Sequence, residues 1–254
     1  MKISPDRQTT VELYDKLRVG LAAEVREGVH VSDLLQPRKA YWQKLNPLPP
    51  TNDEIGYWLA GRAHHYFLVQ ALTGVDDSQE ASLIDPETGV HYSPDLVQLR
   101  GEFKTTRWST LPETEAAALR TFDGYIPQCR AYAALMRVSE WRLYVFFLVA
   151  DDKDTGRKIP TFRVYKLEFT EAELEQERQD VKLRQSALLD AIAARTPEVL
   201  PLCPQYACYI ERRIRNGEPS YVRGANNGRL PAKARTPICK YWHLCKPEGR
   251  YVEQ

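Results

Sequence analysis

The stretch SPDLVQLRGEFKTTR, residues 93–107, places a Pro-Asp pair seven residues before a Glu-Phe-Lys triplet. Successive side chains of a β-strand point to opposite faces, so Glu102 and Lys104 are predicted to share one face. We expect Asp95, on the preceding strand or at its end, to face this pair across a tight hairpin that Gly101 permits. The stretch therefore predicts two carboxylates and a lysine gathered at one point.

Two converging carboxylates repel each other unless a cation joins them, and Mg²⁺ and Mn²⁺ prefer such oxygen ligands. A neighbouring lysine can orient or deprotonate a water, or neutralise charge that develops on a phosphate. Asp95, Glu102 and Lys104 thus suit metal-assisted phosphodiester hydrolysis. The alternative is a set of charges on a surface hairpin, and Asp85, in the loop before, is a rival carboxylate.

Hydrophobic periodicity and turn residues give the chain an α–α–β–β–α–β–β–α order, which predicts an α/β fold with a small mixed β-sheet flanked by helices. Helices are predicted over residues 8–27, 32–45, 53–74, 111–138 (with a break at Pro127) and 170–195, and strands within 81–107 and over 141–150 and 161–169. No linker divides the chain. We expect one domain, 1–254, with N-terminal helices over 1–50, a core over 51–195, and a Cys- and Arg-rich segment over 196–254 packed on that core.

Composition narrows the class of protein. No apolar run approaches the roughly 20 residues that span a bilayer, and the start of the sequence lacks the apolar region of a signal peptide. We therefore expect a cytoplasmic protein with no membrane partner, whose five cysteines are thiols or metal ligands rather than disulfides.

Positive charge is concentrated near the C-terminus. Between Glu211 and Arg250, ten lysine and arginine residues accompany three glutamates. A basic segment of this kind is typical of a phosphate-binding surface. A solvated segment is the alternative.

Two further motifs give the opening stretch a family resemblance. PD…ExK is the signature of the PD-(D/E)XK nuclease superfamily, and GRAHH (residues 61–65) and QCRAY (residues 128–132) resemble the Gly-x-x-x-His and Gln-x-x-x-Tyr motifs of its RecB-like branch. The pattern is most similar to that of the CRISPR-associated RecB-like iron-sulfur exonucleases. The resemblance implies a restriction-endonuclease-like core and a metal-dependent DNA nuclease, an exonuclease acting on strand ends or single strands. It also implies protein partners in CRISPR adaptation, recombination or repair.

The resemblance also implies roles for single residues. The ligands of Mg²⁺ or Mn²⁺ would be His65, Asp95, Glu102 and the carbonyl group of Phe103. His64 competes with His65, but the spacing from Gly61 favours His65.

Three further residues would serve the substrate. Lys104 would position the attacking water, and Gln128 and Tyr132, on one face of a helix, would hold this lysine and a DNA phosphate. DNA could be guided to the site by arginines and could stack on aromatic side chains. The arginines are Arg107, Arg212, Arg213, Arg215 and Arg223, and the aromatic residues are Tyr209, Tyr221 and Trp242.

Four cysteines, Cys203, Cys208, Cys239 and Cys245, lie in the last part of the chain, whereas Cys129 is predicted to be a packed thiol. Their spacings are looser than those of a zinc ribbon. TPICKYWHLC resembles the closing segment of the family's [4Fe-4S] site, but Gln36 and Thr236 stand where that family has cysteines. Either the four cysteines form a site for Fe–S or Zn²⁺, or the cluster has been lost.

Two other functions remain open. A catalytically inactive relative could keep the fold as a DNA-binding or assembly protein. A thiolate metal module that mediates protein contacts would bind Fe or Zn without degrading DNA.

Overall fold

A computed structural model describes most of the chain, and between residues 209 and 237 it describes the backbone alone. The described residues are 7–21, 27–73, 82–151, 155–204, 209–215, 218–223, 235–237 and 239–245. The chain forms two compact units. The first comprises Met1–Val31 and Pro49–Val181, and the second comprises Ser32–Leu48 and Lys182–Gln254.

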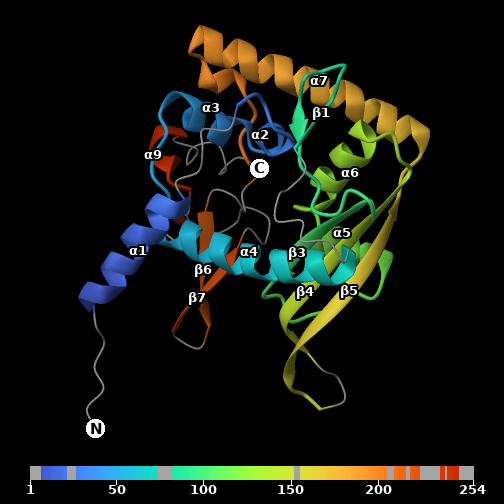
Figure 1. Cartoon of the computed structure of the whole chain (residues 1–254). Coiled ribbons are helices and arrows are strands. Elements are labelled where there is room, and N and C mark those ends of the chain that lie inside the picture. The colour runs from blue at the N-terminus through green and yellow to red at the C-terminus, as the bar shows by residue number, and fades with distance from the viewer. Residues whose placement is uncertain are drawn as a thin grey trace. The chain divides into compact units, whose positions relative to one another are not determined.

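A mixed sheet forms the centre of the first unit, in which the described strands β3 (Gly101–Thr106), β4 (Glu140–Asp151) and β5 (Lys158–Glu168) lie in that order. Strand β3 runs parallel to β4, and β5 runs antiparallel to it (Figure 1). The predicted small mixed sheet flanked by helices is therefore confirmed. Strand β3 is an edge strand of this sheet, which leaves one of its sides open to the turn that carries Asp95.

Helices cover both faces of this sheet. On β4, the alternate side chains of Trp141, Leu143, Val145 and Phe147 are fully buried. The ring of Trp141 contacts α6 (Ile126–Leu135) through Tyr132, whereas the ring of Phe146, on the opposite face, contacts His64 of α4 (Asn52–Thr73). Alternation along the strand thus assigns α6 to one face and α4 to the other.

The connection from β3 to β4 departs from the prediction. The helix predicted over residues 111–138 with a break at Pro127 is indeed interrupted, but over residues 122–125, so that the chain forms α5 (Glu115–Thr121) and α6. Pro127 lies in the first turn of α6, where its missing N–H costs no helical hydrogen bond. The helix therefore begins around this proline rather than breaking at it.

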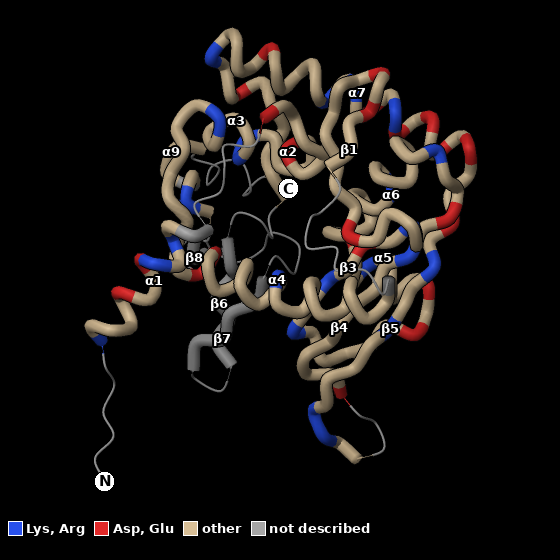
Figure 2. Tube along the Cα trace, viewed as in Figure 1, with Lys and Arg blue, Asp and Glu red and all other residues tan. Residues whose placement is uncertain are grey.

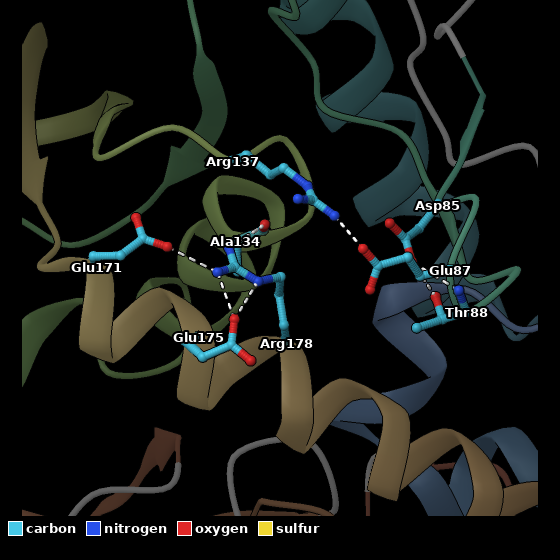
Figure 3. A network of polar contacts seen from close by, with 8 residues as sticks. All are labelled: Asp85, Glu87, Thr88, Ala134, Arg137, Glu171, Glu175 and Arg178. Atoms are coloured by element: carbon cyan, nitrogen blue, oxygen red, sulfur yellow. Dashed lines mark hydrogen bonds and ion pairs between the residues drawn. The ribbon is translucent and has the colours of Figure 1, made fainter.

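Helix α7 (Glu171–Ala194) is tied to the end of α6 by Arg178. Its guanidinium bridges Glu171 and Glu175, at 2.8 and 2.6 Å, and donates to the carbonyl oxygen of Ala134 at 3.4 Å (Figure 3). That carbonyl belongs to the last turn of α6, where it also accepts from the backbone N–H of Arg137 at 3.2 Å. Acidic and basic residues are interspersed along α7 (Figure 2).

The segment before β3 contains less strand than predicted. Among its described residues, from 82 on, the strands are two residues long, β1 (Leu83–Ile84) and β2 (His91–Tyr92), and they pair with each other. Asp95 lies in a turn, and its expected strand is reduced to one bridge, in which Leu96 and Gly101 exchange backbone hydrogen bonds of 3.0 and 3.1 Å. The short interval between Asp95 and Glu102 leaves no room for a longer ladder.

The second unit is more regular than the sequence indicated. The predicted helix over residues 32–45 is divided into α2 (Val31–Leu35) and α3 (Pro37–Leu45), because Pro37 disfavours a helical conformation at Gln36. Its C-terminal part, for which no helix or strand was predicted, contains η1, a described antiparallel sheet in the order β7-β6-β8, and α9. The bounds are η1 (Pro197–Val199), β6 (Tyr209–Arg215), β7 (Glu218–Arg223), β8 (Arg235–Pro237) and α9 (Trp242–Cys245).

The packing of residues 196–254 on the core stays a prediction, as does the division of the chain at residues 50 and 195. Helix α1 is described over Arg7–Leu21, and the remainder of the helix predicted to residue 27 lies largely outside the described residues. Across the described part of the chain, no helix combines the length and the apolar character needed to cross a membrane.

Glycine is required where the turn enters β3. A Cβ atom on Gly101 would lie 2.6 Å from Cε2 of Tyr144 and 3.2 Å from the backbone oxygen of Arg142. At Gly61, in α4, the added atom would meet no described atom within 4 Å. The two glycines therefore predict opposite effects of the same substitution.

We expect Gly101→Ala to lower the free energy of unfolding by about 1–3 kcal/mol, the usual cost of overpacking. Gly61→Ala, the matched control, should leave it unchanged or raise it by roughly 0.5–1 kcal/mol, because alanine favours a helix interior. Urea denaturation measures both. Equal stability of the two variants would contradict the close approach of β3 and β4 at Gly101.

Candidate active site

Glu102 is the centre of the site, and it is 2% exposed. It pairs in register with Leu143 of β4, so its side chain lies on the face of the sheet that α6 covers. Lys104, two residues on, shares that face and donates from Nζ to Oε1 of Glu102 at 2.6 Å. Phe103 points to the other face, where its ring contacts that of Phe162. The alternation expected from the sequence is confirmed.

Asp95 reaches Glu102 from the turn. The backbone N–H of Phe103 donates to Oδ2 of Asp95 at 2.7 Å, and the N–H of Asp95 faces Oε2 of Glu102 at 3.4 Å. The side chain of Asp95 is 13% exposed. The two carboxylates are therefore neighbours, held together by backbone contacts rather than by a second strand.

Burial and charge act on the titration of this cluster. Burial raises the pKa of Glu102 to about 7; the Asp95 charge raises it as well, while Lys104 lowers it. Burial lowers the pKa of Lys104, but the charges of Glu102 and Asp95 outweigh this and leave its pKa raised. One ammonium thus faces two carboxylates, and when both are ionised the excess negative charge favours a cation.

The two histidines of the GRAHH motif lie in different surroundings. Nδ1 of His65 lies 3.4 Å from Oδ1 of Asp95. Nδ1 of His64 lies 2.6 Å from the carbonyl oxygen of Ala60 on its own helix, and its ring rests on Phe146. Of the two imidazoles, the structure brings His65 to the carboxylates.

Gln128 and Tyr132 also meet as expected. Nε2 of Gln128 donates to the hydroxyl oxygen of Tyr132 at 2.9 Å across one turn of α6. Burial raises the pKa of the Tyr132 hydroxyl, and the negative charge of Glu102 raises it further. The hydroxyl therefore keeps its proton beside the carboxylate cluster.

The chemistry of the donor set suits Mg²⁺ or Mn²⁺, since Asp95 lies beside both the carboxylate of Glu102 and the imidazole of His65. Within the described residues, no three His, Cys, Asp or Glu side chains are arranged as a ready metal-binding group. One oxygen of Glu102 instead accepts from Lys104, and one oxygen of Asp95 accepts from Phe103. The ligand roles of His65, Asp95, Glu102 and the Phe103 carbonyl stay predictions.

The rival carboxylate, Asp85, is engaged elsewhere. It is buried, and its Oδ2 accepts from the backbone N–H and the hydroxyl of Thr88 at 2.9 and 2.7 Å. Next to it, Glu87 pairs with Arg137 (Figure 3). Asp85 therefore shapes the turn between β1 and β2.

Two neighbours of the site were not expected from the sequence. The ring of Tyr125 lies below Lys104, with Nζ 5.8 Å from its centroid, and Trp108 contacts Tyr125 in turn. Tyr125 precedes Gln128 by three residues, a helical spacing that could have indicated it. Cys129 is fully buried, which confirms it as a packed thiol.

Three of the four C-terminal cysteines are described, all as thiols in the second unit: Cys203, Cys239 and Cys245. Burial raises the pKa of Cys245 to about 11, and the neighbouring Cys203 and Cys239 raise it as well. Cys203 and Cys239 therefore both act on Cys245, although the three described thiols do not form a ready metal-binding group. Cys208 lies outside the described residues.

The proposed DNA-leading residues of the second unit, Arg212, Arg213, Arg215, Arg223, Tyr209 and Tyr221, lie on β6 and β7, but their side chains are outside the described part of the structure, as is that of Trp242. Arg107 is exposed at the end of β3.

No protein-family model matches the chain, and no curated protein is similar to it in sequence. The crystal structure of SSO0001 is similar to it with a TM-score of 0.37 and 16% identity, covering 72% of this chain and 88% of that chain. An alkaline exonuclease (LHK-Exo) from Laribacter hongkongensis is similar with a TM-score of 0.37 and 15% identity, covering 74% of this chain and 97% of that chain. Likeness at this level does not establish a shared function, which must follow from the site's own residues.

The pKa of Glu102 predicts a pH dependence of stability in the metal-free protein. Between its ordinary value of 4.5 and about 7, the folded protein holds a proton here that the unfolded chain has lost. The stability that the folded protein gains from holding this proton on Glu102 is fully present below pH 4.5 and is lost as the pH rises through 7.

We therefore expect the wild type to lose up to about 3 kcal/mol of stability relative to Glu102→Gln across this window. Urea denaturation in EDTA at a series of pH values measures the difference. Glu87→Gln, at an exposed carboxylate, should follow the wild type. A wild type that gains stability over Glu102→Gln as the pH rises would show that Glu102 is ionised throughout.

Proposed function

We propose that the chain is a metal-dependent deoxyribonuclease that hydrolyses phosphodiester bonds, acting as an exonuclease on strand ends or single strands. The observation that carries this proposal is the buried carboxylate of Glu102 between Asp95 and Lys104. Burial of two adjacent carboxylates is unfavourable without a cation, so such a pair is more consistent with a cation site than with a surface hairpin.

In this proposal, one group of residues binds the metal and Lys104 acts on the water and the phosphate. His65, Asp95, Glu102 and the Phe103 carbonyl would hold Mg²⁺ or Mn²⁺, and the bound ion would supply positive charge for the phosphate and the leaving oxygen. Lys104 stays protonated because two carboxylates raise its pKa. Its role is therefore to donate hydrogen bonds, orienting water and stabilising charge on the phosphate, rather than to remove a proton.

Gln128 and Tyr132 would position the substrate. The Tyr132 oxygen accepts from Gln128, so its own O–H can donate to a phosphate oxygen. Phosphate contacts of this kind fix the register of the strand without reading its sequence. Protein partners in CRISPR adaptation, recombination or repair, and a cytoplasmic location, belong to the same proposal.

Replacement of Glu102 by Gln should lower Mn²⁺-dependent release of nucleotides from end-labelled DNA by roughly 10²–10³-fold, the usual effect of losing one electrostatic element of a site. Lys104→Met should lose activity while retaining Mn²⁺ binding. Glu87→Gln, an exposed carboxylate of the same unit, is the matched control and should remain active.

A wild type that binds DNA but degrades neither single nor double strands in Mg²⁺ or Mn²⁺ would establish the inactive relative instead. Retained activity in Glu102→Gln would place the catalytic centre elsewhere.

We also propose that Cys203, Cys208, Cys239 and Cys245 hold a [4Fe-4S] cluster, or Zn²⁺ in its place. The interaction of Cys245 with both Cys203 and Cys239 supports this. So does the buried indole nitrogen of Trp42, which lies near enough to the Cys245 thiol to lower its pKa and would face a thiolate at that position. A metal there would contribute folding free energy to the second unit.

Protein purified without oxygen should contain stoichiometric Fe or Zn, with visible absorption if the metal is an Fe–S cluster. Cys245→Ser should lose the metal and lower the unfolding temperature of the protein, whereas Cys129→Ser, at the packed thiol of the first unit, should keep the metal. Metal-free wild type under these conditions would show that the four cysteines are thiols.

A further inference from the structure

Trp108 lies just beyond the end of β3 and exposes 41% of its surface. Its indole belongs to an aromatic cluster, contacting the rings of Phe122 at 6.0 Å and Tyr125 at 5.7 Å between centroids. Phe122 is 1% exposed and also packs edge-on against Tyr165 at 4.7 Å. Trp108 is therefore the solvent-facing member of a cluster whose other members are more buried.

The same cluster reaches the candidate active site. Tyr125 contacts Trp108 on one side and lies 5.8 Å below Nζ of Lys104 on the other. A single ring thus separates the exposed indole from the lysine that faces the phosphate. A strand with a phosphate at Lys104 would bring a neighbouring nucleotide to Trp108.

The backbone around Trp108 is held on both sides. Its N–H donates to the hydroxyl of Thr106 at 3.2 Å, and the carbonyl oxygen of Ser109 accepts from the N–H of Asp151 at 2.7 Å. The indole therefore projects from a backbone anchored to β3 and β4. A ring already fixed in place loses little conformational entropy when a ligand stacks on it.

We propose that Trp108 is a stacking platform for an unpaired base of the DNA strand whose phosphate lies at Lys104. The inference rests on the proposed function and gives it a substrate class. In the interior of a duplex the faces of each base are covered by its neighbours, so there an indole can stack only on a base that is unpaired and splayed out. The site therefore takes single-stranded DNA or the end of a duplex, where a base face is open.

The charge beside Trp108 fits the same substrate. Arg107 is exposed at the adjacent position, so a cation and an aromatic face follow one another along the chain. Proteins that bind single strands combine such basic residues with stacking surfaces, and they do so with little preference for sequence. We thus expect binding that depends on the presence of a base rather than on its identity.

The test compares an oligothymidylate strand with the same strand carrying abasic nucleotides near its end. Binding is measured by fluorescence anisotropy in EDTA, where no hydrolysis occurs, and degradation is measured separately in Mn²⁺. Trp108→Leu should weaken binding of the normal strand about tenfold or more, whereas Trp108→Phe should retain most of it. For the abasic strand, wild type and Trp108→Leu should bind equally.

Trp58 provides the matched control, because it exposes 42% of its surface on α4. Trp58→Leu should bind both strands like the wild type. An equal loss in both tryptophan variants would show that exposed aromatic area, not Trp108, determines binding, and would overturn the proposal.

Further outcomes separate this inference from the proposed function. If the wild type degrades DNA while Trp108→Leu binds both strands unchanged, or loses affinity for both equally, the stacking role is wrong and the nuclease stands. A wild type that binds the abasic strand as tightly as the normal one overturns the stacking role even if Trp108→Leu fails to fold. A wild type that neither binds nor degrades any DNA overturns both.

Discussion

The site depends on the burial of one carboxylate. Glu102 is placed on the covered face of β3 beside a second carboxylate, where ionisation is unfavourable without compensating charge. Lys104 supplies one positive charge to Glu102, and the imidazole of His65 lies 3.4 Å from the carboxylate of Asp95. A buried group of this kind is costly for stability, so its position is better explained by what it binds than by what it contributes to the fold.

The topology explains how motifs distant in the sequence converge. Because β3 and β4 are parallel, the chain must cross over between them, and α5 and α6 make that connection. The crossover lays α6 on the face that carries Glu102 and Lys104, which brings Gln128 and Tyr132 to them. Helix α4 lies on the other face, and its His65 contacts Asp95 in the turn that precedes β3.

Local periodicity was enough to predict part of this arrangement. Alternation placed Glu102 with Lys104, and helical spacing placed Gln128 with Tyr132, because both depend only on near neighbours in the chain. The turn at Asp95, the separation of α5 from α6 and the sheet of β6–β8 depend on register and tertiary contacts, which a single sequence does not specify. The presence of Trp108 and Tyr125 beside the site was not predicted for the same reason, because their contact joins a loop to the start of a helix.

The bridge between Leu96 and Gly101 makes the geometry of the site adjustable. Asp95 is held near Glu102 by a short turn, through the backbone hydrogen bonds between Leu96 and Gly101 and through its own contacts with Phe103 and Glu102. Units this small open with far less free energy than the whole fold. Opening of this turn would separate Asp95 from Glu102 while β3 stays paired with β4, and any ligand that needs both carboxylates would shift that local equilibrium toward the closed turn. Affinity at this site is then partly a property of the hairpin's own opening equilibrium, and residues of the turn that never touch a ligand can tune it.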